Sequence, residues 1–126
     1  MIIGIGTDIV QIDRIKRVYE RQGHRFVERV LCPSEFSIFE KKKQSIPYLA
    51  KRFAAKEAAS KALGTGIGPV SWQDMEISNN SSGAPILRLK GAAKERMELI
   101  GAHQISISLS DELDYAVAFV VLSSAL

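Results

Sequence analysis

A fifteen-residue stretch in the middle of the chain, Leu49–Leu63, constrains the fold more than any other feature of this sequence. It contains no Gly, Pro or β-branched residue, and Gly64 follows at once, where a helix commonly ends in a left-handed conformation. At about 100° per residue its alanines share one broad flank, and side chains this small allow another backbone to approach closely. These alanines are Ala50, Ala54, Ala55, Ala58, Ala59 and Ala62. The stretch therefore predicts a central helix with one face suited to close packing.

A second row on this helix begins apolar and ends charged. Leu49, Phe53, Glu57 and Lys61 are spaced four residues apart, about 6 Å along the helix axis. Glu57 and Lys61 have the order of an exposed i,i+4 ion pair, worth about 0.3 kcal/mol. Alternatively they enter an apolar environment, where a carboxylate needs an ion or a donor to offset its desolvation. The spacing alone leaves both interpretations open.

The length and composition of the chain indicate one domain spanning residues 1–126. The chain has 126 residues, of which 46% are hydrophobic and 25% charged, enough for one ordinary core. Its single cysteine, Cys32, excludes an intrachain disulfide and any multi-cysteine zinc site, which fits a cytosolic protein best. The apolar start of the chain is too short for a signal peptide or a membrane span, so we expect no membrane partner.

Charge is unevenly placed along the sequence. The net charge is +3, but residues 1–69 hold 13 Lys or Arg against 7 Asp or Glu, whereas residues 70–126 hold 4 against 7. The segment from Asp13 to Arg29 alone carries six basic residues and three acidic ones. The first half of the chain therefore suits an anionic partner, which could be nucleic acid, a phosphorylated small molecule or an acidic protein.

Periodicity predicts an α+β fold. The N-terminal half reads as one buried strand followed by helices, at about 1–6, 11–22, 25–30, 33–43 and then the central stretch, with a loop up to Pro47. The C-terminal half reads as two hairpins with one helix between them: strands at 75–78 and 85–90, a helix at 92–100, and strands at 104–109 and 115–122. One strand, several helices and a mainly antiparallel sheet with one inserted helix describe an α+β domain.

Asp8 interrupts the first apolar run. It follows Gly6 and Thr7 and precedes Ile9 and Val10, and aspartate is depleted in strands. It could be a helix N-cap or an Asx-turn as the strand ends. It could instead be a metal-binding carboxylate at the strand end.

The glycine-rich segment 64–69 does not have the context of a P-loop. It comes after a helix, whereas a P-loop precedes one and directs its amides at the phosphate. We expect a helix C-cap and an irregular loop here. The backbone N–H groups of such a loop could still hold a phosphate in a nest.

Asp8 and Glu57 together suggest a magnesium site, if the fold brings them together. Mg²⁺ commonly takes one or two protein carboxylates and completes its coordination with water and substrate phosphates. Lys61, one turn beyond Glu57, could reach the same phosphate, and Arg52 could hold another phosphate group. These groups would suit phosphoryl-type transfer, in which positioning and charge neutralisation supply most of the catalysis.

At these residues the sequence resembles a known family. Gly4-Ile-Gly-Thr-Asp-Ile-Val10, Arg52-Phe-Ala-Ala-Lys-Glu-Ala-Ala-Ser-Lys61 and Gly64-Thr-Gly66 are similar to the motifs of the holo-[acyl-carrier-protein] synthases. These enzymes are the short bacterial members of the 4′-phosphopantetheinyl transferase superfamily. The resemblance extends from Met1 into the final strand, and its motifs G-x-D and K-E-x-x-x-K are fairly specific in combination.

The resemblance implies a reaction and a site. The enzyme would transfer the 4′-phosphopantetheine group of coenzyme A to a serine of apo acyl carrier protein for fatty acid biosynthesis, leaving adenosine 3′,5′-bisphosphate. Asp8 and Glu57 would hold Mg²⁺, and Lys61 would stabilise charge on the phosphoryl oxygens. Arg52, Gly64, Thr65 and Gly66 would lie along the nucleotide portion of coenzyme A. Glu57 or a water on the metal would accept the serine proton.

The resemblance also implies partners. The family assembles as trimers with active sites at subunit boundaries, and its carrier-protein partner is acidic. Arg14, Arg21 and Arg25 match the basic segment that receives this partner. Some relatives carry a histidine where this chain has Gln104 or Ser106, so we assign no catalytic role to His24 or His103.

Two other classes of protein fit parts of the sequence. The basic segments around Arg14–Arg29 and Lys41–Lys43 could belong to a nucleic-acid-binding protein, but they lack an RNP-like aromatic pattern and helix-turn-helix spacing, so we expect no nucleic acid. A non-enzymatic module that only binds acyl carrier protein would keep Asp8 and Glu57 as structural acids.

Overall fold

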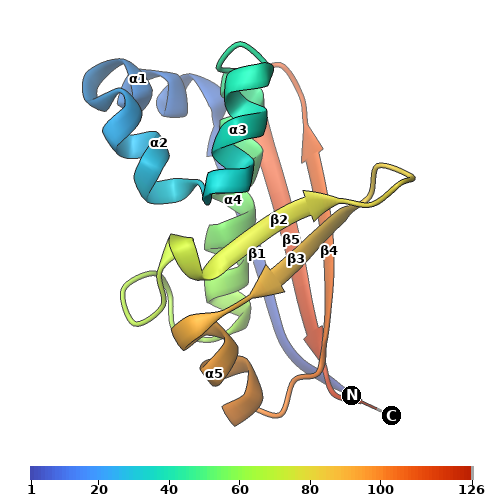
Figure 1. Cartoon of the computed structure of the whole chain (residues 1–126). Coiled ribbons are helices and arrows are strands. Elements are labelled where there is room, and N and C mark those ends of the chain that lie inside the picture. The colour runs from blue at the N-terminus through green and yellow to red at the C-terminus, as the bar shows by residue number, and fades with distance from the viewer. Residues whose placement is uncertain (126) are drawn as a thin grey trace.

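One long helix, α4 (Ile46–Ala62), runs through the middle of the molecule, between a cluster of helices and a sheet (Figure 1). The structure is a computed structural model that describes residues 1–125. Ser45 caps α4 by accepting a hydrogen bond from the Tyr48 N–H, and Gly64 follows the helix with a φ of 78°. The helix begins three residues before the predicted Leu49, because Pro47 lies in its first turn, where a missing N–H costs nothing.

The other N-terminal helices lie beside the first half of α4. They are α1 (Ile12–Gln22), α2 (His24–Val30) and α3 (Pro33–Lys41), close to their predicted bounds. Gly23 separates α1 from α2 with a φ of 61°, a conformation that glycine adopts without strain. Glu35 joins Cys32 in a capping box at the start of α3.

The strands form two antiparallel sheets, which confirms the predicted α+β class and both hairpins. β1 (Ile2–Gln11), β4 (Gln104–Asp111) and β5 (Tyr115–Ser123) make a three-stranded sheet in the order β1-β5-β4. β2 (Met75–Asn79) and β3 (Pro85–Leu89) form a separate two-stranded ribbon that crosses in front of α4 (Figure 1). The short 3-10 helix η1 (Trp72–Asp74) precedes β2, and α5 (Gly91–Leu99) joins the ribbon to β4.

β1 is longer than the sequence suggested, and this corrects the position of Asp8. The strand was expected to end near Gly6, but it continues to Gln11, and Asp8 pairs with Ala118 of β5 in its interior. Asp8 is therefore neither a helix N-cap nor part of an Asx-turn at a strand end. The partner strand β5 fixes the extended backbone here, which outweighs the low strand propensity of aspartate.

Glycines on β1 and alanines on α4 allow the strand to lie directly on the helix. A Cβ atom at Gly4 would come within 2.1 Å of the Ala62 carbonyl oxygen, and one at Gly6 within 1.9 Å of the Ala58 carbonyl oxygen. No other residue type fits at either position without moving the strand. The alanine flank of the helix therefore has the close contact that its side chains predicted.

The sheet has two different faces. The inner face packs on α4 and contributes Ala116, Ala118, Val120 and Leu122, all buried, to the core. On the outer face β4 presents only polar side chains at its exposed positions, but β1 and β5 present large apolar ones. These exposed apolar residues include Ile5, Ile9, Tyr115, Val117 and Phe119. Among the described residues, no helix has the length and hydropathy needed to span a membrane.

Candidate active site

Asp8 and Lys61 meet where β1 crosses the last turns of α4. The Lys61 ammonium nitrogen lies 3.0 Å from the Asp8 Oδ1 atom and donates a second hydrogen bond to the Thr7 carbonyl oxygen, also at 3.0 Å. The Asp8 side chain is 16% exposed and that of Lys61 is 52% exposed. Of the two interpretations that the spacing left open, the exposed Glu57–Lys61 ion pair is not the one observed in the described residues, because Lys61 extends to β1.

Glu57 belongs to the same cluster. Its side chain is half-buried, and burial raises the pKa of its carboxyl, with a further rise from the negative charge of Asp8. The neighbouring Trp72 side chain and the positive charge of Lys61 act to lower this pKa. Two carboxylates from elements about fifty residues apart therefore share one small region with a single ammonium group, which leaves one negative charge to be offset.

The composition of this cluster suits magnesium. Mg²⁺ binds through one or two carboxylates and keeps its other positions for water and phosphate oxygens. Asp8 and Glu57 supply that number, and the described residues contain no group of three or more His, Cys, Asp or Glu side chains that could enclose a metal ion. A structural zinc site, with its four protein ligands, does not fit here.

A hollow of about 410 Å³ opens beside Lys61. It is lined by Ile5, Gly6, Thr7, Lys61 and Phe119, so it connects the charged cluster with the apolar outer face of the sheet. β1 is an edge strand of its sheet, so within the described residues no further strand pairs with it on this side of the hollow.

Comparison with known proteins assigns the chain to a family. Residues 4–120 match the model of the 4′-phosphopantetheinyl transferase superfamily. The chain belongs to this superfamily. It is 52% identical over 124 residues to the holo-[acyl-carrier-protein] synthase of Photobacterium profundum, with 98% of each chain covered.

Solved structures of superfamily members have the same fold. The crystal structure of holo-[acyl-carrier-protein] synthase from Neisseria meningitidis matches with a TM-score of 0.91 and 44% identity, covering 98% of this chain and all of that one. The Helicobacter pylori enzyme in complex with coenzyme A matches with a TM-score of 0.84 and 40% identity, covering 94% and 99%. The predicted family resemblance is confirmed.

In the described structure Arg52 contacts Tyr48 and Asn79 rather than the charged cluster. It is 4% exposed, its guanidinium stacks over Tyr48 at 4.6 Å, and it donates a hydrogen bond to the Asn79 Oδ1 atom at 3.0 Å. Its Nε atom is buried without a hydrogen-bond partner among the described residues. The expected contact between Arg52 and coenzyme A stays a prediction.

The backbone N–H groups of the glycine loop after α4 donate hydrogen bonds to carbonyl oxygens of that helix. The N–H groups of Thr65 and Gly66 both donate to the Ser60 carbonyl oxygen at 3.1 Å, and that of Gly64 donates to the Lys61 carbonyl oxygen. A phosphate nest built from these three amides is therefore not formed in this arrangement. The loop has the predicted helix-ending conformation, and its contact with the nucleotide also stays a prediction.

Two residues near the site were missing from the sequence-based set. Trp72, the single tryptophan, lies close enough to Glu57 to affect its pKa, and its buried Nε1 atom has no hydrogen-bond partner among the described residues. Arg96 of α5 donates from Nε to the Leu63 carbonyl oxygen at 2.9 Å, beside Gly64. Neither residue belongs to a recognisable motif. The position of a single tryptophan just after the glycine loop could, however, have indicated Trp72.

The predicted docking arginines and the histidines lie outside β1 and α4, the elements that carry the cluster. Arg14 and Arg21 are on α1 and Arg25 is on α2; all three are exposed, and none has an ion-pair partner among the described residues. His24 faces Glu40, and His103 contacts the Gly101 carbonyl oxygen.

Proposed function

We propose that this chain transfers 4′-phosphopantetheine from coenzyme A to a serine hydroxyl of apo acyl carrier protein, and releases adenosine 3′,5′-bisphosphate. The observation that carries this proposal is the meeting of Asp8, Glu57 and Lys61 beside an open hollow. Relatives that match almost the whole chain are named holo-[acyl-carrier-protein] synthase, and the Helicobacter pylori relative was solved in complex with coenzyme A.

Each member of the cluster has a role in this reaction. Asp8 and Glu57 would hold Mg²⁺, and that ion would supply positive charge to neutralise the pyrophosphate. The serine oxygen forms a bond to the β-phosphorus of coenzyme A, and the bond from that phosphorus to the bridging oxygen breaks. Lys61 stabilises the negative charge that develops on the phosphoryl oxygens and the leaving bisphosphate.

Glu57 is the candidate within the chain for accepting the serine proton. Without a bound ion, burial and then the Asp8 charge raise the pKa of its carboxyl. A bound Mg²⁺ would lower that pKa, so a water on the metal is the alternative proton acceptor. The nucleophile itself belongs to the carrier protein, so the chain needs no serine or cysteine of its own at the site.

The partner is an acidic carrier protein that docks on α1 and α2. Arg14, Arg21 and Arg25 are exposed, and within residues 1–125 none of them forms an ion pair. Exposed charges of this kind mainly accelerate encounter, and salt weakens their effect.

The working form is a homotrimer with each active site at a subunit boundary. Ile5, Ile9, Val117 and Phe119 form an exposed apolar face on the three-stranded sheet, and such a face is typical of an interface. The hollow beside Lys61 includes Ile5 and Phe119, so a subunit covering this face would also form a wall of the site. The cytoplasm, where coenzyme A and carrier protein are present together, is the expected location.

Intact-mass spectrometry of the carrier protein tests this function. The purified chain is incubated with coenzyme A, Mg²⁺ and apo acyl carrier protein, with a chelator added to a parallel sample. We expect the carrier serine to gain the mass of one phosphopantetheine arm with Mg²⁺ and to gain nothing with the chelator. No gain under conditions where an established transferase works would exclude the enzyme and leave a carrier-binding module or a nucleic-acid-binding protein.

A further inference from the structure

The C-terminal end of α2 is held by side chains from two other elements. Lys56 of α4 donates from its ammonium to the Val30 carbonyl oxygen at 2.5 Å. The Gln73 side chain of η1 donates to the carbonyl oxygens of Glu28 and Leu31, each at 2.7 Å. The last carbonyl groups of a helix have no partner within the helix, so these two side chains fix where α2 ends.

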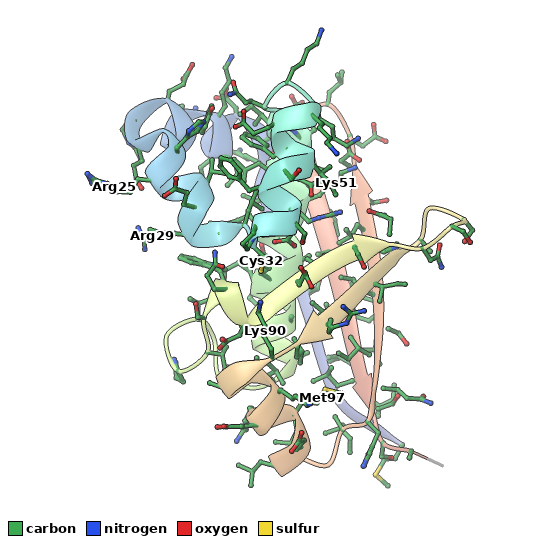
Figure 2. The ribbon with its side chains drawn as sticks, viewed as in Figure 1. Arg25, Arg29, Cys32, Lys51, Lys90 and Met97 are labelled. Carbon is green, nitrogen blue, oxygen red and sulfur yellow. The ribbon has the colours of Figure 1, made fainter. Side chains whose placement is uncertain are left out.

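Lys56 is itself fixed by a buried carboxylate. Its ammonium lies 2.6 Å from the Glu35 Oε1 atom, and neither side chain is exposed to solvent. Glu35 also accepts hydrogen bonds from the backbone N–H groups of Cys32 at 2.7 Å and Ile77 at 2.8 Å. One network therefore joins α2, α3, α4 and β2, and Cys32 lies at its centre, at the junction of α2 and α3 (Figure 2).

Such a network is poorly explained by stability alone. A buried ion pair pays a large desolvation cost, and apolar residues of similar volume often replace it without loss of stability. Its hydrogen bonds are directional, however, so it defines one relative position for the elements that it joins.

Each residue that holds α2 is next in sequence to a group of the active site. Lys56 precedes Glu57, and Gln73 follows Trp72, whose ring centre lies 6.1 Å from that of Phe53, one turn before Glu57 on α4. α2 carries Arg25 and Arg29, which project outward from it (Figure 2), and the Arg29 guanidinium lies 5.5 Å from the centre of the Trp72 ring. The network thus connects the basic docking surface with the charged cluster.

We propose that Lys56 and Gln73 are positioning residues, which hold the catalytic helix α4 and the docking helix α2 in one relative position and so keep Glu57 aligned with Asp8. This inference rests on the proposed function. A helix with its side chains is about 10–12 Å across, so a rotation of α4 by roughly 20° would move the Glu57 carboxylate by about 2 Å. A displacement of about 1 Å at a reacting group can lower a rate by about 100-fold.

The test replaces the buried pair by neutral side chains of similar size. The double variant Lys56→Met/Glu35→Gln removes both charges and the bond to α2 but leaves the core filled. We expect a folded protein by circular dichroism with a kcat for carrier modification at least tenfold lower. We also expect Mn²⁺, followed by electron paramagnetic resonance with coenzyme A present, to bind at least threefold more weakly.

Two controls separate positioning from general destabilisation. Lys51→Met makes the same substitution on the same helix and breaks the ion pair with Asp111, away from the network (Figure 2). Phe39→Leu destabilises the core through a fully buried side chain of α3. Both are expected to keep kcat and Mn²⁺ affinity within twofold of the wild type.

Gln73→Met gives a second measurement if the double variant does not fold. Gln73 is half-buried, so its replacement should leave the fold intact, and we expect kcat to fall at least threefold with no change in the KM for coenzyme A. If kcat and Mn²⁺ affinity stay within twofold of wild type in whichever variants fold, the network is structural and the inference is wrong. If the wild-type chain itself transfers nothing, the proposed function is wrong.

Discussion

At the scale of single residues, Asp8 is a carboxylate that lies between Thr7 and Ile9 on an apolar strand, and it is mostly buried. An unpaired polar group in such a place costs several kcal/mol, and a charged one costs more. Lys61 offsets part of this cost through a contact of 3.0 Å. Glu57 adds a second carboxylate nearby, and its raised pKa reflects the remaining repulsion between like charges as well as its burial. A divalent cation would relieve that repulsion, which is why we interpret the cluster as a metal site.

Glu57→Gln should nearly abolish transfer. The substitution keeps the shape of the side chain but removes one charge from the metal site, so we expect kcat to fall by roughly 100-fold or more. Intact-mass assays at saturating coenzyme A and Mg²⁺ measure the effect. Glu98→Gln, the same change on the exposed surface of α5, should have no effect. Activity within a few-fold of wild type in Glu57→Gln would mean that the metal assignment is wrong.

The same variant should change the dependence of stability on pH. Because the pKa of Glu57 is raised in the fold, its protonated form is the favoured one, and stability is lost as the pH rises above the ordinary carboxyl pKa of about 4.3 and through the folded-state value. Gln carries no charge at any pH. Without divalent ions, Glu57→Gln should therefore unfold at a higher temperature than wild type at pH 8, with a smaller difference at pH 4. A difference that grew toward acid pH would contradict the assigned direction.

At the scale of secondary-structure elements, the site depends on how closely β1 lies on α4. Gly6 and Ala58 bring the two backbones together, and this contact places Asp8 over the last turns of the helix. The Lys61 ammonium then reaches the Thr7 carbonyl oxygen as well as Asp8. A wider separation between strand and helix would remove both hydrogen bonds.

Gly6→Ala tests this contact. The added Cβ atom would be 1.9 Å from the Ala58 carbonyl oxygen, so the strand must shift, and overpacking of this kind costs about 1–3 kcal/mol. We expect a lower free energy of unfolding in urea and a loss of transfer activity. Thr7→Ala, which alters the exposed side of the same strand, should change stability by less than about 0.5 kcal/mol. Unchanged stability in Gly6→Ala would refute the packing argument.

The docking surface on α1 is tested by charge reversal. Arg14→Glu/Arg21→Glu should raise the KM for acyl carrier protein by tenfold or more at low salt and leave the KM for coenzyme A unchanged, because these arginines are on α1 whereas the cluster is on β1 and α4. Added salt should reduce the difference in the KM for acyl carrier protein between the variant and the wild type. Lys90→Glu/Lys94→Glu changes the net charge equally at exposed positions near α5 and serves as the control. An equal rise in the KM values for acyl carrier protein and coenzyme A would mean that these arginines do not form a docking surface specific to the carrier protein.

The order and type of the elements could be predicted from the sequence because periodicity, prolines and glycines mark them locally. The full length of β1 could not be predicted, because aspartate is rare in strands and suggests that the strand ends there. Only the pairing of Asp8 with β5 shows that the strand continues. Lys61 pairing with β1 rather than Glu57 also depends on packing that no local pattern records. The buried pair of Lys56 and Glu35 is equally hidden, because both residue types are common on surfaces.

At the scale of the whole molecule, the three-stranded sheet is covered by α4 on one face and exposes large apolar side chains on the other. Ile5 and Ile9 are each more than 60% exposed, and Phe119 is 44% exposed. Contiguous apolar surface of this kind usually marks an interface in a protein of this size. Because the hollow beside Lys61 shares Ile5 and Phe119 with this face, assembly and catalysis should depend on the same surface.

Phe119→Lys should therefore separate the subunits. The side chain is exposed in the single chain, so a charge there should not unfold it, but it would be buried in the assembly at a large cost. We expect light scattering after gel filtration to give a trimer mass for wild type and a monomer mass for the variant, with transfer lost at the same time. Ile86→Lys, at an exposed apolar position on β3 outside this face, is the control. A monomeric variant with full activity would disprove a site shared between subunits.

A crystal structure with coenzyme A and Mn²⁺ in place of Mg²⁺, with the metal located by its anomalous scattering, tests the central claim most directly. We expect one ion between the Asp8 and Glu57 carboxylates, with water and pyrophosphate oxygens as its other ligands and Lys61 beside the phosphates. An ion held elsewhere, or a pyrophosphate bound away from these two carboxylates, would contradict it.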